Sequence, residues 1–515
     1  MEKAPFKVLF SNDTTNIETC ISPYHKSGEL FNPRMLEAAV DETAGIGVDV
    51  HLLQPGQGWV PFWKSRSYPL NEHIRFMKER FGLDPSGDFY ARYLAAGGDM
   101  VAVFVKRCRG KNLVPFVSLR LNDGHGREFI NMPREKIEGW AWYSLCPILT
   151  EHPQWRIGDS LNWKERGLNW AIPEVRRFKL AYIQELCEQY DLDGFELDFM
   201  RYPSFFRVGE TSVEERRRIM ADFVSDVRQI LDRTAAPGRH RWLCVRIPAC
   251  LAEHDALGID VRRFADGGVE MFNLSYYFFT EQQGDYAEIK KILPDAAVYV
   301  EMCHATAVGP PLKVASVAGA DDFTFRRTTD RQYYTTAHLA YTRGLDGVSV
   351  FNFAYYREHG TAGRGPFNEP PFRIFRHLRE PRWLTRQPQH YFLSKVWNGN
   401  RQLPRCLEPG QTATFVLDMV PPSGGWREKG RLRVQSRTPM QEVCFKATFN
   451  GIQLSPADDL SEPYSNSYLP LLGTAETLRG WTVPNVIVKN GVNRIEITMQ
   501  NGNPVELVFL DLAIC

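Results

Sequence analysis

Short apolar segments alternate with helical patterns up to about residue 360, and this alternation constrains the fold more than any other feature of the chain. Each apolar segment ends in polar or glycine-rich residues, as strands of a buried parallel sheet do. Eight segments are predicted strands: 6–13, 47–56, 112–123, 193–203, 241–249, 270–278, 297–305 and 346–356. Strand and helix in alternation, eight times over, is the order of a (β/α)8 TIM barrel, a fold of the α/β class.

The chain after about residue 365 has a different pattern. A stretch rich in proline and arginine precedes alternating strands, with hairpin turns predicted at Asn450-Gly451 and Asn490-Gly491. A chain of 515 residues is too long for one compact core. We therefore expect a barrel over 1–375, a linker over 376–405 and an all-β sandwich over 406–515.

Charge and hydropathy exclude two classes of partner. Lys and Arg number 62 against 61 Asp and Glu, so no global basic field attracts nucleic acid or an anionic membrane. No run reaches the roughly 18 apolar residues that span a bilayer. The start, MEKAPFKVLFSND, lacks the pattern of a signal peptide. We expect a cytoplasmic protein, or a periplasmic or secreted one if a leader has been removed, and the oligomeric state stays open.

Strand alternation predicts which side chains face the barrel axis. One alternate set packs on the outer helices and the other points inward. With the apolar set placed outward, the predicted inward residues are Asp49, His51, Ser118, Arg120, Asn122, Glu196, Asp198, Arg246, Tyr299 and Glu301, together with Asn273, Ser275 and Tyr277 of the more polar set on the sixth strand.

Four of the inward residues are carboxylic acids, and three of them, Glu196, Asp198 and Glu301, lie on the fourth and seventh strands. Barrel enzymes do their chemistry at the carboxyl ends of the strands, where the fourth and seventh strands approach from roughly opposite sides. In glycoside hydrolysis one carboxyl group protonates the leaving oxygen, and another attacks the anomeric carbon or activates water. We therefore predict that Asp198 and Glu301 are catalytic, with Glu196 as the third candidate. The alternative is structural ion pairing, for example of Glu196 with Arg120.

Aromatic residues and arginines suggest a carbohydrate substrate. Sugar rings stack on Trp and Tyr, and two predicted loop regions hold seven of the twelve tryptophans: Trp59, Trp63, Trp140, Trp142, Trp155, Trp163 and Trp170. Guanidinium groups bind carboxylate and sulfate, which gives the hypothesis of an acidic sugar. The arginines could equally neutralise the barrel's own carboxylates. The predicted substrate-binding residues are Arg120, Asn122, Arg201, Arg246, Asn273, Tyr277, His304, His51, Trp59 and Trp63.

One segment resembles a known family. EHPQW (151–155) followed by IPEVRRFKLAYIQELCEQYDLDGFELDFMRYP (172–203) resembles the middle of the bacterial glycoside-hydrolase-like family 10 proteins, through Tyr190, Asp191, Asp193, Gly194, Asp198, Tyr202 and Pro203. The strand also resembles the nucleophile strand of α-amylase-type barrels. The resemblance implies a barrel glycoside hydrolase in which Asp198 is the nucleophile.

Departures from these families bear on the proton donor. Met200 stands where family 18 chitinases have their acid, and Arg246 lies on the strand that supplies the acid in α-amylase-type enzymes. Glu196 and Phe199 stand where family 10-like proteins have His and Asp. We expect Glu301 to be the acid, while an exchange of the two roles and an acid role for Glu196 stay open.

Two other functions fit the same pattern. One is a non-catalytic carbohydrate-binding barrel, in which the carboxylates only accept hydrogen bonds, and the other is a polysaccharide lyase or transglycosylase. Asp49, His51, His125 and His304 lack tight metal-ligand spacing, and no GxSxG, Walker or GxGxxG pattern stands in context, so no metal and no cofactor are expected.

Overall fold

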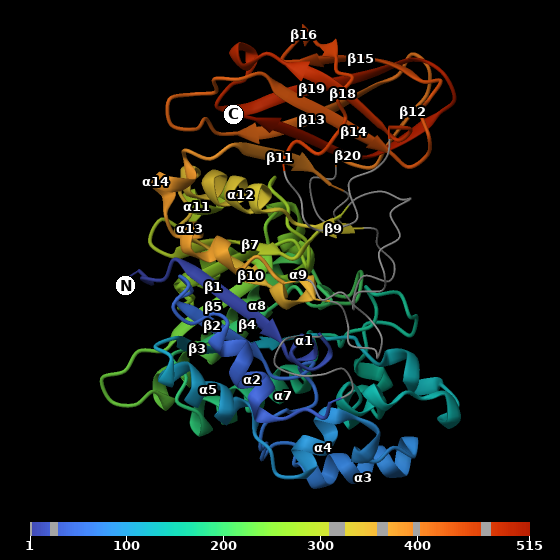
Figure 1. Cartoon of the computed structure of the whole chain (residues 1–515). Coiled ribbons are helices and arrows are strands. Elements are labelled where there is room, and N and C mark those ends of the chain that lie inside the picture. Colours follow the sequence, from blue (N-terminus) through green and yellow to red (C-terminus); the bar gives the residue numbers. More distant parts are fainter. Residues whose placement is uncertain (1–2, 21–28, 308–324, 358–368, 395–401, 465–474) are drawn as a thin grey trace.

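The chain folds into a closed parallel barrel followed by two antiparallel sheets (Figure 1). The structure is a computed structural model and describes residues 3–20, 29–307, 325–357, 369–394, 402–464 and 475–515. The predicted fold class, a (β/α)8 barrel with a C-terminal β-sandwich, is confirmed.

Each of the eight predicted strand segments contains one barrel strand. All neighbours pair in parallel, in the order β1-β10-β7-β6-β5-β4-β3-β2, and the barrel closes between β1 and β2. The strands are β1 (Val8–Asp13), β2 (Val50–Gln54), β3 (Val114–Arg120), β4 (Gly194–Asp198), β5 (Trp242–Pro248), β6 (Met271–Ser275), β7 (Ala297–Cys303) and β10 (Gly347–Phe351). A short antiparallel pair, β8 (Ala305–Ala307) with β9 (Phe325–Arg327), follows β7.

Helices connect the barrel strands. They are α1 (Thr14–Thr19), α2 (Pro33–Asp41), α3 (Leu70–Phe81), α4 (Phe89–Ala95), α5 (Met100–Gly110), α6 (Pro147–Thr150), α7 (Pro173–Gln189), α8 (Val213–Thr234), α9 (His254–Leu257), α10 (Val261–Asp266), α11 (Tyr286–Ile292) and α12 (Asp330–Thr342). Helix α7 begins at Pro173 and buries Val175, Tyr182 and Leu186 against the barrel. Among the described residues, no helix combines the length and apolarity needed to cross a membrane.

The barrel axis has an apolar end and a polar end. At the amino ends of the strands an apolar cluster fills the interior, formed by Leu9, Val50, Leu52, Phe116, Cys244, Met271, Ala297 and Tyr299. Gly194 is needed here because a Cβ atom at this position would lie 2.2 Å from the ring of Phe116. The polar inward residues therefore gather at the carboxyl ends of the strands.

The C-terminal domain is a sandwich of two sheets around its own core (Figure 1). The first sheet holds β11 (Gln389–Leu393), β12 (Arg405–Leu407), β14 (Gly430–Ser436), β17 (Ser455–Pro456), β18 (Leu478–Val483) and β20 (Val505–Ile514). The second holds β13 (Thr412–Met419), β15 (Cys444–Phe449), β16 (Ile452–Gln453) and β19 (Gly491–Asn501).

Only one of the two predicted hairpins is present. Asn450 and Gly451, with φ of 51° and 82°, join β15 to β16. The hairpin predicted at Asn490-Gly491 is wrong, because β18 and β19 belong to different sheets and the turn only leads into β19.

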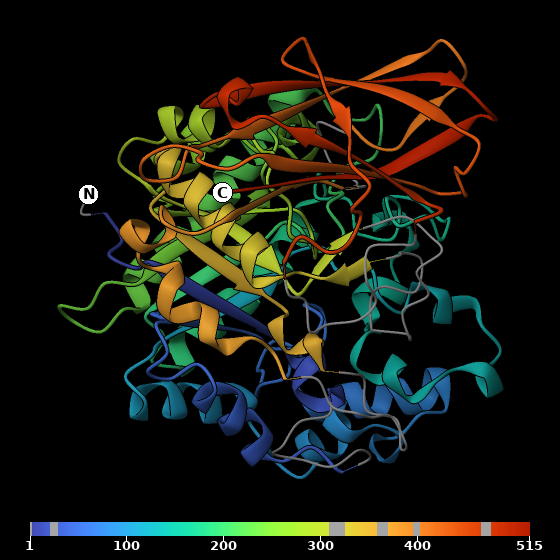
Figure 2. The same cartoon turned by 45° about the horizontal axis from the view of Figure 1, so that its top comes forward.

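The segment 376–405, expected as a linker, carries regular structure where it is described. It includes the end of α13 (Phe375–Leu378), helix α14 (Pro381–Leu384) and β11, which pairs with β20. The same strand contacts the barrel helix α12, since the backbone N–H of His390 donates to Thr335 Oγ1 at 2.8 Å. Strand β11 is therefore the strand of the sandwich that contacts the barrel (Figure 1), and Figure 2 shows the two domains from another side.

Candidate active site

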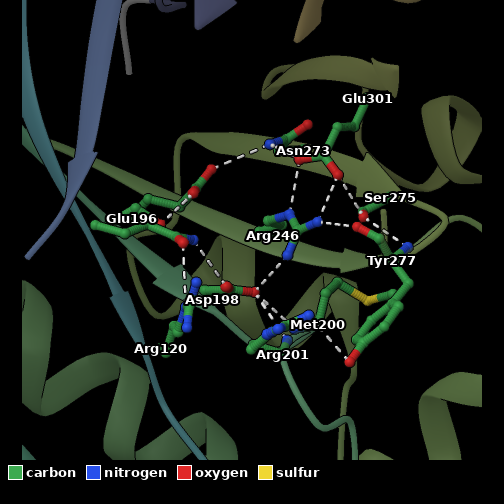
Figure 3. A network of polar contacts seen from close by, with 12 residues as sticks. Arg120, Glu196, Asp198, Met200, Arg201, Arg246, Asn273, Ser275, Tyr277 and Glu301 are labelled. Carbon is green, nitrogen blue, oxygen red and sulfur yellow. Dashed lines mark hydrogen bonds and ion pairs between the residues drawn. The ribbon is translucent and has the colours of Figure 1, made fainter. Parts of the chain in front are cut away.

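Arg246 joins the two carboxylates that the sequence singled out (Figure 3). It points inward late in β5, which pairs with β4 on one side and is separated from β7 by β6 on the other. Its Nη1 donates to Asp198 Oδ1 at 2.9 Å, and its Nε and Nη2 donate to the two oxygens of Glu301 at 2.7 and 2.6 Å. All three side chains are at most 2% exposed. Carboxylates from two separate strands thus converge on one guanidinium at the carboxyl end of the barrel.

The carboxylate of Asp198 accepts further hydrogen bonds. Its Oδ1 accepts from the backbone N–H groups of Met200 at 2.8 Å and Arg201 at 3.2 Å, and its Oδ2 accepts from Gln54 Nε2 at 3.1 Å. The first two donors lie in the turn that follows β4, so the local chain path itself creates them. Three donors besides Arg246 therefore fix the orientation of the Asp198 carboxylate.

The carboxyl group of Glu301 also accepts several hydrogen bonds. Besides its two contacts with Arg246, it accepts from Ser275 Oγ at 2.6 Å and from Asn273 Nδ2 at 3.2 Å. Both donors are inward residues of β6, the strand beside β7. Four hydrogen bonds, two of them from one guanidinium, fix the position of the Glu301 carboxyl group.

Glu196 lies two residues before Asp198 and therefore deeper along the axis. It accepts from Ser118 Oγ at 2.7 Å and from Asn273 Nδ2 at 3.1 Å, so the amide of Asn273 bridges Glu196 and Glu301. Burial raises the pKa of Glu196 to about 7, and the nearby charge of Asp198 adds to the rise. Glu196 thus holds a proton in part of the molecules near neutral pH.

Arg120 belongs to a second charged group that the sequence prediction missed. Its guanidinium contacts Asp13 at 2.5 Å, Asp123 at 2.9 Å and Gln54 Oε1 at 3.1 Å, so the ion pair considered with Glu196 does not form. Burial alone would raise the pKa of Asp13, but the charges of Arg120 and Arg201 outweigh it and lower that pKa. Asp13 and Asp123 end the first and third predicted strand segments, and this position alone could have marked them as site residues.

Arg201 and Tyr277 lie beside this group. Arg201 is partly exposed and donates to the hydroxyl of Tyr277 at 3.2 Å and to His125 Nε2 at 2.9 Å. His125, also absent from the predicted substrate-binding set, contacts Asp123 through Nδ1 at 2.6 Å. The backbone carbonyl of Tyr277 accepts from Arg246, which connects this group to the two catalytic candidates.

His51 does not face the barrel axis, so the parity assigned to the second strand is wrong. Its ring lies on the outer side, between the rings of Phe10 and Phe104, and its Nδ1 lies 3.0 Å from Thr43 Oγ1. The inward positions of β2 are the apolar Val50 and Leu52, followed by Gln54. Burial lowers the pKa of His51 to about 3, so the ring is neutral and serves packing.

The predicted tryptophan platform is wrong for its buried members. Trp59 is 1% exposed, donates to the carbonyl of Asp123 at 2.7 Å and is covered by Lys179 Nζ, 3.7 Å from the ring centre. Trp63 is 4% exposed and donates to Glu185 at 2.7 Å. The remaining loop tryptophans are buried (Trp142 and Trp170) or half-buried (Trp140, Trp155 and Trp163).

Two further predicted binding residues have structural contacts. Asn122 Nδ2 donates to the carbonyls of Leu168 and Ser204 at 2.9 and 2.6 Å, so it joins two loops at the rim of the barrel. His304 is buried beside Cys303, with 3.1 Å between Nδ1 and Sγ. In the described part of the chain, no three His, Cys, Asp or Glu side chains come together as a metal site.

Comparisons with known proteins give structural likenesses only. No protein-family model matches the chain, and no curated protein matches it. Among solved structures it is similar to a glycoside hydrolase family 20 β-N-acetylglucosaminidase (TM-score 0.39, 12% identity, 74% of this chain and 69% of that one). It is also similar to α-L-fucosidase isoenzyme 2 from Paenibacillus thiaminolyticus (TM-score 0.40, 12% identity, 76% of this chain and 51% of that one). A third similar structure is an α-amylase from Geobacillus thermoleovorans (TM-score 0.36, 11% identity, 96% of this chain and 99% of that one). At such identities neither substrate nor reaction transfers to this chain.

Proposed function

We propose that this protein is a glycoside hydrolase that cleaves an oligo- or polysaccharide at the carboxyl end of its barrel. The observation that carries the proposal is the convergence of Asp198 and Glu301, from β4 and β7, on Arg246. Two carboxyl groups on opposite sides of one bond are what glycoside hydrolysis requires. The barrel (1–375) is then the catalytic domain, and the sandwich, whose first strand is β11, is an accessory domain.

In this proposal Asp198 is the nucleophile. Its oxygen attacks the anomeric carbon as the glycosidic C–O bond breaks, and water later replaces Asp198 on that carbon. Four donated hydrogen bonds orient the carboxylate of Asp198 at the carboxyl end of β4. Two displacements at one carbon restore its configuration, so we expect retention of the anomer, which proton NMR of the first product reads directly.

The proton comes from the Glu196 and Glu301 pair. Asn273 bridges the two side chains, and burial raises the pKa of Glu196 to about 7, so the pair carries a proton in part of the molecules near neutral pH. Glu301 lies closer to the carboxyl end of the barrel. In those molecules in which Glu301 holds the proton of the pair, it protonates the leaving oxygen and becomes a carboxylate. The attacking water later returns a proton to the same pair.

The test is product release from neutral, uronic and sulfated glycans. The variants are Asp198→Asn and Glu301→Gln, and the control is Asp222→Asn on the exposed surface of α8. We expect both site variants to lose about a hundredfold or more in kcat/KM while the control keeps full activity and all remain folded. If the wild type cleaves and Glu301→Gln is unaffected, the donor role passes to Glu196. Full activity of folded Asp198→Asn would remove the nucleophile assignment.

A second candidate function is carbohydrate binding without catalysis. It is favoured by the complete pairing of Asp198 and Glu301 with Arg246 at 0% and 2% exposure. Glycan binding without cleavage by the wild type would establish it. A polysaccharide lyase on the same scaffold would reveal itself in the same panel, because its unsaturated product absorbs in the ultraviolet, and a transglycosylase would lengthen part of its substrate.

A further inference from the structure

Arg201 differs from the other arginines of the site because its described partners are neutral. Arg120 is paired with Asp13 and Asp123, and Arg246 with two carboxylates. The guanidinium of Arg201 contacts the hydroxyl of Tyr277 and the imidazole of His125. Its Nε is buried and has no hydrogen-bond partner among the described residues. Although burial opposes its charge, nearby groups including Asp123 raise the pKa of Arg201, so this side chain is a cation with an unused hydrogen-bond donor.

The position of Arg201 is fixed from several sides. The centre of its guanidinium lies 5.8 Å from the ring centre of Tyr202 and 5.3 Å from that of Tyr277. Both tyrosines have positive φ, 55° and 71°, which is a strained backbone for a residue with a bulky side chain. The chain therefore accepts strain at the two residues whose rings flank this cation.

A hydrogen-bonded relay orients the same guanidinium. Because an arginine side chain can only donate, Nε2 of His125 accepts the hydrogen bond from Arg201. The proton of the neutral His125 ring is therefore on Nδ1, which donates to Asp123 at 2.6 Å. Asp123 is itself fixed by Arg120 at 2.9 Å and by the backbone N–H of His125 at 2.8 Å. Asp123 thus sets the tautomer of His125, and His125 sets the direction of Arg201.

We propose that Arg201 binds an anionic group of the substrate, a carboxylate or a sulfate on a sugar. This inference rests on the proposed function for the kind of substrate, and it narrows the acidic-sugar hypothesis to one arginine. Arg120 and Arg246 are excluded because their charges are already paired within the protein. The guanidinium of Arg201 contacts Tyr277, whose backbone carbonyl accepts from Arg246, the partner of Asp198. An anion on Arg201 therefore places the sugar at the same end of the barrel as the nucleophile. Asp123 and His125 are positioning residues for this arginine.

The test measures binding, so it does not depend on turnover. Glucuronic acid, glucose 6-sulfate and glucose are titrated by calorimetry or ligand-observed NMR, at neutral pH and low ionic strength. We expect the wild type to bind at least one anionic sugar about tenfold more tightly than glucose. A gain in affinity of this size is what one hydrogen bond to a charged group contributes. The sugar that is preferred identifies carboxylate or sulfate as the group.

The variants separate recognition from folding. Arg201→Gln should bind the anionic sugar and glucose equally, whereas Arg218→Gln, the same charge change on the exposed surface of α8, should keep the preference. His125→Ala should weaken anionic binding and leave glucose binding unchanged, and His125→Gln, which keeps an acceptor, should restore part of it. Should Arg201→Gln fail to fold, Tyr277→Phe removes one contact of the guanidinium and should lower the preference a few-fold.

Two outcomes would overturn the inference: a wild type without preference for either anionic sugar, and an Arg201→Gln variant that keeps the preference. Cleavage of neutral glycans without such a preference would leave the proposed hydrolase and remove the anion site. A preference that Arg201→Gln abolishes, in a protein that cleaves none of the glycans, would leave the anion site and remove the hydrolase.

Discussion

At the scale of single residues, the guanidinium of Arg246 compensates the charges of two buried carboxylates, Asp198 and Glu301. Asp198 and Glu301 are 0% and 2% exposed, and both are hydrogen-bonded to Arg246. Burying an ion pair stabilises a protein little, but removing one partner leaves a buried charge without compensation. This arrangement is therefore sensitive to the loss of the arginine and contributes little to stability while it is intact.

Arg246→Ala should lower the free energy of unfolding by about 3–5 kcal/mol at neutral pH, because two neighbouring carboxylates lose their shared cation. Urea denaturation followed by far-ultraviolet circular dichroism measures it. The control is Arg218→Ala, which removes an exposed pair with Asp222 and should change the free energy by less than about 1 kcal/mol. Equal losses in the two variants would mean that Arg246 compensates no buried charge.

Glu196 makes stability depend on pH. Its pKa is raised from 4.5 to about 7 by burial, so its contribution is fully present below the unfolded pKa and is lost as pH rises through about 7. Between pH 5 and pH 8 the free energy of unfolding of the wild type should fall by about 2 kcal/mol relative to Glu196→Gln. Urea denaturation at both pH values measures the difference. Glu174→Gln, on the partly exposed start of α7, should show no such change relative to the wild type, and equal curves for the wild type and Glu196→Gln would contradict the prediction.

At the scale of elements, alternation in a strand predicts the inner face only where the two faces differ in polarity. On β3, β4 and β7 the outward set is apolar and the inward set is polar near the carboxyl end, so the sequence predicts the orientation of Arg120, Asp198 and Glu301. On β2 the first two inward residues, Val50 and Leu52, belong to the apolar amino end, whereas the polar His51 packs outward. The alternation of polar and apolar residues does not show how far along the barrel axis a residue lies, and on β2 the apolar residues near the amino end are the inward ones.

Loop residues were predicted less well, because their environment depends on contacts distant in the sequence. Trp59 is buried because Lys179, on α7, covers its ring, and no local pattern shows that contact. The pairing of Asp123 with His125 is local, but its link to Arg201 brings together the ends of β3 and β4. Sequence alone could name the inward carboxylates of β4 and β7, but it missed Asp13 and Asp123 and could not show which arginine pairs with which carboxylate.

The β15–β16 hairpin offers a test of a single turn. Gly451 has φ of 82°, and a Cβ atom there would meet nothing within 4 Å, so only the backbone conformation opposes alanine. Gly451→Ala should lower the free energy of unfolding by about 1 kcal/mol. The matched control is Gly110→Ala at the end of α5, which is also open to solvent but has no positive φ and should be neutral or slightly stabilising. Thermal denaturation compares the two, and similar effects of both changes would contradict the turn assignment.

At the scale of the whole molecule, the sandwich is attached to the barrel by buried hydrogen bonds. Gln282, in the loop after β6, is 0% exposed; its Nε2 donates to the carbonyl of His390 at 3.1 Å, and its Oε1 accepts from the N–H of Phe392 at 2.9 Å. Across the same interface Arg326 pairs with Glu462 at 2.9 Å. The sequence pattern of the segment 376–405 indicated a linker, because a five-residue strand among prolines and arginines resembles a loop until its partner strand is known.

Such an interface should make the two domains unfold together. Differential scanning calorimetry of the wild type should show one transition. Gln282→Ala leaves the carbonyl of His390 and the N–H of Phe392 without a partner in a buried place, so the free energy of unfolding should fall by about 2–4 kcal/mol and the single midpoint by several degrees. Gln500→Ala, at an exposed position of β19, should leave the midpoint unchanged. Two separate wild-type transitions, with one unmoved by Gln282→Ala, would mean that barrel and sandwich are independent and that contacts through β11 transmit no stability between them.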